Sequence, residues 1–146
     1  MMYPEQIVAP MREELTRLGV EELRSADAVH AKLKDASGTQ LVVVNSVCGC
    51  AARNARPAVA MALQGTSRPD ALYTVFAGQD GDATQAARGY FTGYPPSSPS
   101  IALLKDGDVA FMLERWQIEG RSAQEIAADL AGAFATHCAP AGSPAA

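Results

Sequence analysis

Apolar residues at helical spacing open this chain. Ile7, Met11, Leu15 and Leu18 recur every three or four positions, which predicts the apolar face of an amphipathic helix. Pro10 is compatible with that helix if it lies within the first turn, where a missing N–H costs no hydrogen bond. The charged residues between the apolar ones are expected on the opposite face, toward solvent: Arg12, Glu13, Glu14 and Arg17.

Further helices are indicated by capping signals and composition. Ser25 can cap a helix that ends before Gly38, and residues 84–91 are compatible with a short helix. Residues 51–63 are rich in alanine and favour a helix that Pro57 would kink rather than end. Residues 122–125 form a capping box that opens a last helix. The apolar residues expected on the buried faces are Val29, Leu33, Ile126, Leu130 and Phe134.

Short apolar runs predict the strands. Residues 40–46 hold three consecutive valines, which is typical of a buried parallel strand, and residues 71–77 predict a second strand. After a loop with three prolines at 95–99, residues 100–105 and 109–113 flank Asp106-Gly107, a strong hairpin signal.

The order of these elements indicates the fold. Two helices precede a β-α-β-α-β-β-α series, which is the layout of a thioredoxin-like domain. We therefore expect the α/β class, with a central mixed sheet flanked by helices and an N-terminal helical extension. At 146 residues the chain fits one domain over 1–138, and the Ala, Pro, Gly and Ser of 139–146 predict a disordered tail.

Composition and charge narrow the function classes. A hydrophobic fraction of 48% and a charged fraction of 19% fit a globular protein, and the net charge of −4 argues against nucleic acid as a partner. The sequence has no apolar run long enough for a membrane span and no basic-then-apolar leader, so we expect a cytoplasmic protein with no membrane partner. Two of its three cysteines share one tripeptide, which points to reactivity or metal binding rather than stapling.

The candidate catalytic residues are Cys48 and Cys50. A strand that delivers Cys48 to the start of a helix places its sulfur near unpaired backbone N–H groups, which lower a thiol pKa. Cys48 is therefore the candidate nucleophile and Cys50 the resolving thiol. Gly49 relaxes the backbone between them. A disulfide between Cys48 and Cys50 would close a small, strained ring and would therefore be easily reduced.

Other interpretations of the cysteines remain open. The pair could be inert and buried beneath a helix, or could bind a soft metal ion such as Cu(I) or Zn. A complete zinc site would need further ligands, and the chain offers only His30, His137 and Cys138, so we predict no metal site. Cys138 ends the last predicted helix and is either a packed cysteine or a second resolving thiol.

Residues around the cysteines supply candidates for substrate binding. We predict that the Ser98–Pro99 peptide is cis and that the backbone of Ser98 pairs with a substrate chain lying over Cys48. Arg53 and Arg56 either stabilise the thiolate or attract an anionic thiol, or they belong to a solvated helix face.

Three side chains near the site have a less specific interpretation. Asn45 and Ser46 either bond to the sulfurs or fix the turn before them. Trp116 is expected in the core or at its rim.

Several segments of the sequence resemble the bacilliredoxin family. The most specific is Leu-Val-Val-Val-Asn-Ser-Val-Cys-Gly-Cys-Ala-Ala at 41–52. Agreement extends to Val-Phe-Ala-Gly-Gln-Asp at 75–80, Tyr-Phe-Thr-Gly at 90–93, Pro-Pro-Ser-Ser-Pro-Ser at 95–100, Ile-Glu-Gly at 118–120 and His-Cys at 137–138. The similarity runs from Tyr3 to Cys138. One departure is Arg115-Trp116, where family members often have Arg-His.

This resemblance implies a thioredoxin-like thiol–disulfide oxidoreductase with a Cys-Gly-Cys active site. It implies bacillithiol as co-substrate, no tightly bound cofactor, and bacillithiolated client proteins as partners. By the same resemblance, Cys48 matches the attacking cysteine and Cys50 the resolving one. A general disulfide reductase or isomerase would carry the same cysteines.

Overall fold

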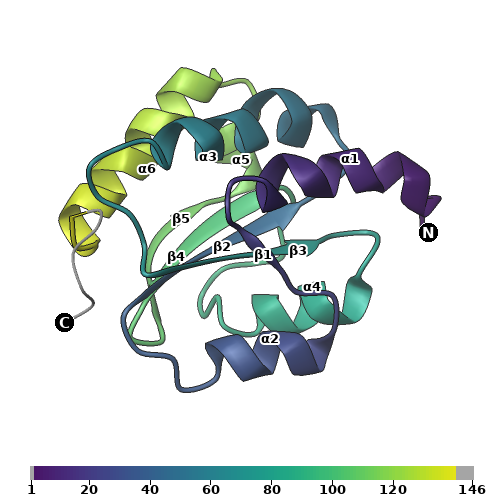
Figure 1. The fold of residues 1–146 in the computed structure, drawn as a ribbon, viewed down its shortest axis with the longest axis horizontal. Coiled ribbons are helices and arrows are strands. Elements are labelled where there is room, and N and C mark those ends of the chain that lie inside the picture. The colour runs from purple at the N-terminus through teal and green to yellow at the C-terminus, as the bar shows by residue number, and fades with distance from the viewer. Residues whose placement is uncertain (1, 141–146) are drawn as a thin grey trace.

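The computed structural model describes residues 2–140, in which a five-stranded mixed sheet lies between two layers of helices (Figure 1). The strand order is β1-β3-β2-β4-β5. The strands are β1 (Glu21–Glu22), β2 (Thr39–Asn45), β3 (Ala71–Phe76), β4 (Ser100–Lys105) and β5 (Asp108–Leu113).

Strand β2 is the centre of the sheet. It runs parallel to β3 and antiparallel to β4, which continues through a tight turn into the antiparallel β5. Asp106 and Gly107 occupy that turn with φ of 51° and 89°. Two positive φ values are what a type I′ hairpin turn requires, so the predicted Asp-Gly hairpin is confirmed.

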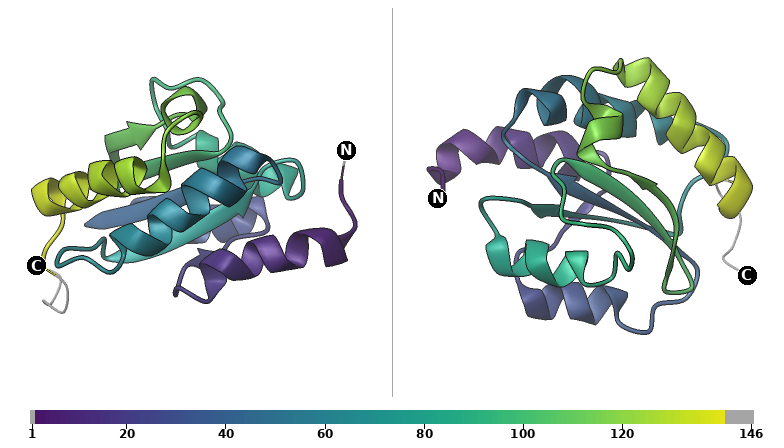
Figure 2. Two further views of the ribbon diagram at one scale, coloured as in Figure 1. Left: turned by 90° about the horizontal axis from the view of Figure 1, so that it is seen from above. Right: turned by 180° about the vertical axis from the view of Figure 1, so that it is seen from behind.

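The helices divide between the two faces. The structure has α1 (Glu5–Thr16), α2 (Ala26–Leu33), a π-helical turn η1 (Ala51–Ala55), α3 (Arg56–Ala62), α4 (Gly81–Arg88), α5 (Arg115–Ile118) and α6 (Ala123–His137). Helices α1, α3 and α6 lie on one side of the sheet, and α2 and α4 lie on the other (Figures 1 and 2). The predicted α/β class and thioredoxin-like arrangement are thus observed.

Side chains of β2 alternate between two separate cores. Leu41 and Val43 pack under α3 and α6, whereas Val42 and Val44 pack under α2 and α4. All seven residues of β2 are buried. Because both faces are covered by helices, the strand has no solvent side, which explains its uninterrupted run of apolar residues. The strand therefore holds the loop after Asn45 in a fixed position.

The structure of helix α1 differs from three predictions. Its buried residues are Val8, Arg12 and Leu15, whereas Ile7 is 50% exposed. Arg12, expected in solvent, is only 5% exposed because it reaches carboxylates on other elements. The helix begins at Glu5, so Pro10 lies inside it, beyond the first turn where it was expected.

Several element boundaries also differ from the sequence prediction. Helix α4 begins at Gly81, three residues before the predicted start, and the short elements β1 and α5 were not predicted. Residues 51–63 form the π-helical turn η1 followed by α3, and Pro57 is the second residue of α3, within the first turn, where its missing N–H costs no hydrogen bond. Most of the predicted tail, residues 141–146, lies outside the described residues, and Pro140 bridges to Ser67.

Candidate active site

A rigid loop connects β2 to the cysteine pair. The side-chain oxygen of Asn45 accepts hydrogen bonds from the backbone N–H of Ser46 and from Arg56 Nη1, both over 2.9 Å. Its amide nitrogen donates to the carbonyl of Met11 over 3.2 Å. Asn45 therefore fixes the turn and joins it to α1. Of the two roles expected from the sequence, bonding to the sulfurs or fixing the turn, it has the second.

Arg56 also helps to fix the loop between β2 and the cysteine pair. It is 3% exposed, donates to the carbonyl of Ser46 over 3.0 Å and pairs with Glu14 Oε1 over 3.2 Å. A buried guanidinium with these partners is part of the protein interior. Arg56 therefore does not lie on a solvated helix face, as one alternative predicted, and its guanidinium is not exposed to attract an anionic thiol.

Ser46 contacts the sulfur of Cys48 directly. Its hydroxyl donates to Cys48 Sγ over 3.2 Å, and the backbone N–H of Cys48 donates back to Ser46 Oγ over 3.4 Å. Burial raises the pKa of Cys48, but hydrogen bonds from Ser46, from the backbone N–H groups of Ala51 and Cys50, and from the Cys50 thiol outweigh it and lower the pKa below its ordinary value. Cys48 is therefore the more readily ionised thiol of the pair.

The pKa of Cys50 moves in the opposite direction. Burial raises it first, followed by the charge of Cys48 and by hydrogen bonds to Cys48 and Glu119. Arg115 lowers it by a smaller amount. Because the two pKa values move in opposite directions, Cys48 ionises before Cys50. All three cysteines are free in this structure.

Arg53 lies over the glycine between the cysteines. A methyl group built on Gly49 would come within 2.6 Å of Arg53 Nη2. The guanidinium therefore occupies the space beside Gly49. This places Arg53, a predicted substrate-binding residue, next to the cysteine pair.

The short helix α5 and the residue that follows it supply two side chains that were not assigned to the site from the sequence. Glu119 Oε2 lies 3.6 Å from Cys50 Sγ and 2.8 Å from Arg115 Nε. Arg115 also donates through Nη1 to the carbonyl of Ser98 over 3.2 Å. The available signals were their i, i+4 spacing and the Ile-Glu-Gly segment at 118–120, and neither assigns a role, since i, i+4 ion pairs are common on exposed helices.

A cavity of about 240 Å³ opens beside Cys48. Its lining includes Cys48, Ser46, Ser98, Arg115 and Tyr3. Ser98, a predicted substrate-binding residue, therefore lies beside the cysteine. The Ser98–Pro99 peptide is cis, as predicted from the sequence, and Pro99 itself is buried.

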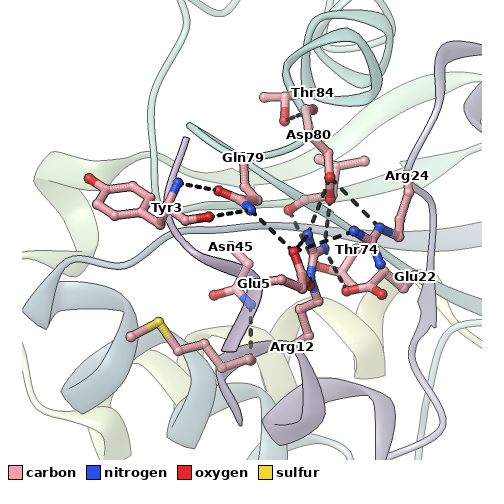
Figure 3. A network of polar contacts seen from close by, with 12 residues as sticks. Tyr3, Glu5, Arg12, Glu22, Arg24, Asn45, Thr74, Gln79, Asp80 and Thr84 are labelled. Carbon is pink, nitrogen blue, oxygen red and sulfur yellow. Dashed lines mark hydrogen bonds and ion pairs between the residues drawn. The ribbon is translucent and has the colours of Figure 1, made fainter. Parts of the chain in front are cut away.

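Tyr3 reaches this cavity because Gln79 holds its backbone. The N–H of Tyr3 donates to Gln79 Oε1 over 2.8 Å, and Gln79 Nε2 donates to the Tyr3 carbonyl over 2.9 Å (Figure 3). Gln79 Nε2 also donates to Glu5, which pairs with Arg12 over 2.7 Å. Arg12 in turn pairs with Asp80 over 2.6 Å. The start of the chain is thereby joined to the β3–α4 loop.

A second cavity of about 470 Å³ adjoins the first and shares Ser98 and Arg115 with it. Trp116 lines it and is 72% exposed, so the prediction that this residue lies in the core or at its rim is wrong. Its Nε1 donates to Glu114 Oε2 over 3.0 Å. The indole needs no buried partner because α5 projects it from the surface.

The third cysteine lies away from the pair. Cys138 follows the last residue of α6, and its side chain forms a hydrogen bond with Thr39, the first residue of β2. Cys48, in contrast, follows the end of that strand. Seven strand residues span about 20 Å, so Cys138 lies at the opposite end of β2 from Cys48. Burial raises its pKa. These observations favour the packed role over a second resolving thiol.

Two further properties concern the part of the chain that the structure describes. Within residues 2–140, no group of three or more His, Cys, Asp or Glu side chains is placed to hold a metal ion. No helix in that range is long and apolar enough to cross a membrane.

Comparisons with known proteins add to this geometry. A family model described as disulphide isomerase matches residues 3–138. A bacilliredoxin of Koribacter versatilis is 56% identical over 137 residues, covering 94% of each chain. A bacilliredoxin of Salinibacter ruber is 56% identical over 140 residues, covering 94% of this chain and 82% of its own. One of Bacillus licheniformis is 53% identical over 137 residues, covering 93% of this chain and 95% of its own.

Proposed function

This chain belongs to the bacilliredoxin family of thiol–disulfide oxidoreductases, and from that premise we propose that it removes bacillithiol from protein mixed disulfides. In this proposal Cys48 attacks and Cys50 resolves. The observation that carries it is the hydrogen-bonded, ionisable sulfur of Cys48 at the wall of an open cavity. A thiolate in such a place is the reactive form in disulfide exchange.

The first step is an exchange at Cys48. Its thiolate attacks the bacillithiol sulfur of the mixed disulfide, and a new disulfide forms between Cys48 and bacillithiol. The bond to the client's sulfur breaks, and the client leaves as a thiolate that takes a proton from water. The lowered pKa of Cys48 supports this step because more of the thiol is ionised near neutral pH.

The second step regenerates the enzyme. Either a second bacillithiol attacks the mixed disulfide on Cys48, or Cys50 attacks Cys48 and releases bacillithiol. The internal disulfide is then reduced by a low-molecular-weight thiol. Cys50 stays protonated until needed, because burial and the neighbouring charge of Cys48 raise its pKa.

We assign substrate contacts to the residues around Cys48. Ser98 lines the cavity, and Pro99 follows it in the chain. The guanidinium of Arg53 beside Gly49 offers donors to the carboxylates of bacillithiol. Together these residues would place the small thiol near the sulfur that attacks it.

A second candidate is protein disulfide isomerisation. The description of the matching family model favours it, and the same two cysteines would carry it out. An isomerase attacks protein disulfides with Cys48 and uses Cys50 to escape from trapped mixed disulfides. Refolding of a protein with scrambled disulfides measures this activity separately.

The test of the proposed function is turnover of a protein carrying bacillithiol on one cysteine. Wild type and Cys50→Ala should release the client thiol, and Cys48→Ala should not. Cys138→Ala is the matched control, since it removes a thiol at the opposite end of β2 from the pair. If folded, reduced wild type releases no client thiol, the proposed function is wrong.

A further inference from the structure

The thiol of Cys50 has one hydrogen and two neighbouring acceptors. Its Sγ lies 3.6 Å from Oε2 of Glu119, within reach of a hydrogen bond from a thiol, and it also donates to the sulfur of Cys48. While Cys48 is a thiolate, both acceptors are negatively charged. Once Cys48 is bonded to another sulfur it loses its charge, and the carboxylate becomes the stronger acceptor.

We propose that Glu119 accepts the proton of Cys50 in the resolving step, when Cys50 attacks the mixed disulfide on Cys48. This inference rests on the proposed function, because it concerns the second half of that reaction. Glu119 touches a reacting sulfur, so the role is catalytic.

The step balances without an external oxidant. The S–H bond of Cys50 breaks, its proton passes to Glu119, and the electron pair left on Cys50 forms the bond to Cys48. The bond between Cys48 and the small thiol's sulfur breaks, and the small thiol leaves as a thiolate with the electron pair of that broken bond. Cys50 is oxidised and the small thiol is reduced, taking its proton from Glu119 or from water.

Arg115 positions the carboxylate for this transfer. Its Nε donates to Glu119 over 2.8 Å, and its backbone N–H donates to Ser97 Oγ over 2.6 Å. The hydrogen bond from Arg115 is the largest cause of the lowered pKa of Glu119, which is therefore ionised at neutral pH. Besides Arg115, the charged or titratable groups near Cys50 and Glu119 are Cys48 and Arg53, which lies over Gly49.

A simple charge effect predicts the opposite result. A carboxylate that acts only through its charge disfavours the Cys50 thiolate, so its removal would free Arg115 to stabilise that thiolate and would speed resolution. A proton acceptor speeds resolution, so its removal slows it. The sign of the change in rate therefore distinguishes the two roles.

The experiment is a single-turnover reaction with a bacillithiol–protein mixed disulfide. Client-thiol release reports attack by Cys48, and later bacillithiol release reports resolution by Cys50. The variants are Glu119→Gln, Glu119→Asp and the control Glu13→Gln, which removes an exposed carboxylate of α1. Each is followed between about pH 6 and about pH 8.5, across which the thiols change ionisation.

We expect Glu119→Gln to leave client release within about twofold of wild type and to slow resolution about 100-fold near neutral pH. Its resolution rate should then rise about tenfold per pH unit, as expected when only thiol ionisation supplies the nucleophile. Wild type should show a shallower profile. Glu119→Asp should retain part of the wild-type resolution rate, and the control Glu13→Gln should resolve at the wild-type rate.

Client release also serves as the folding control within each variant. If Glu119→Gln resolves at the wild-type rate or faster, the inference is overturned and the proposed function stands. If both Glu119 variants lose client release, the carboxylate supports the structure and the inference is again overturned. If wild type itself releases no client thiol, the proposed function fails and the inference fails with it.

Discussion

The hydroxyl of Ser46 donates to the sulfur of Cys48 over 3.2 Å, from two residues earlier in the same loop. Ser46 is 7% exposed, and the Asn45 and Arg56 side chains fix the backbone on both sides of it. The backbone N–H of Cys48 donates to Ser46 Oγ over 3.4 Å, which favours the position of the hydroxyl beside the sulfur. Among the groups that lower the pKa of Cys48, Ser46 has the largest effect.

Ser46→Ala should raise the pKa of Cys48 by about one unit, because a hydrogen bond to a charged group contributes about 1.5 kcal/mol or more. Alkylation of Cys48 at neutral pH should slow by roughly tenfold. Absorbance of the thiolate against pH measures the pKa in a Cys50→Ala, Cys138→Ala background. The exposed Ser37→Ala is the control, and an unchanged pKa in Ser46→Ala would contradict the prediction.

Tyr3 and Gln79 offer a test of the cavity wall. Gln79→Ala keeps the ring but removes both hydrogen bonds that hold the Tyr3 backbone, whereas Tyr3→Ala keeps those bonds and removes the ring. Both should lower kcat/KM for a mixed disulfide several-fold, because the substrate loses one wall of its site. The pKa of Cys48 should not move. Tyr3→Phe retains the wall and should behave like wild type; equal losses in Tyr3→Phe would place the effect in the hydroxyl instead.

Arg12 should stabilise the fold far more than its exposed neighbour. Arg12→Met leaves Asp80 buried without its closest partner, and breaking a buried pair in this way costs about 3 kcal/mol of unfolding free energy. Arg24 pairs with the same carboxylates but is 53% exposed, so Arg24→Met should cost under about 1 kcal/mol. Urea denaturation measures both. Similar losses in the two variants would show that burial of Arg12 is unimportant.

Cys138 should be slow to react and unnecessary for turnover. Burial raises its pKa, so less of it is thiolate at neutral pH. Alkylation of wild type at neutral pH should modify Cys48 first and Cys138 much later, as mass spectrometry of digests can follow. A mixed disulfide between Cys138 and Cys48 or Cys50 during turnover would overturn this prediction.

Elements set by local pattern were predictable. The three valines of β2, the Asp-Gly turn between β4 and β5, and the Ser122 capping box each depend on a few neighbouring residues. The position of Cys48 and Cys50 after a buried strand followed from the same kind of pattern. In contrast, the two-residue β1 and the four-residue α5 are too short to leave a periodic signal.

The sequence by itself determined the order of the main elements and the identity of the cysteine pair, because periodicity, caps and turn residues act between close neighbours. Only the tertiary structure decided which distant side chains meet. Glu119 and Cys50 are 69 positions apart, and Tyr3 and Gln79 are 76 apart. Arg12 is buried only because α1 packs against carboxylates of β1 and of the loop before α4. Those contacts depend on how whole elements pack, which local pattern does not encode.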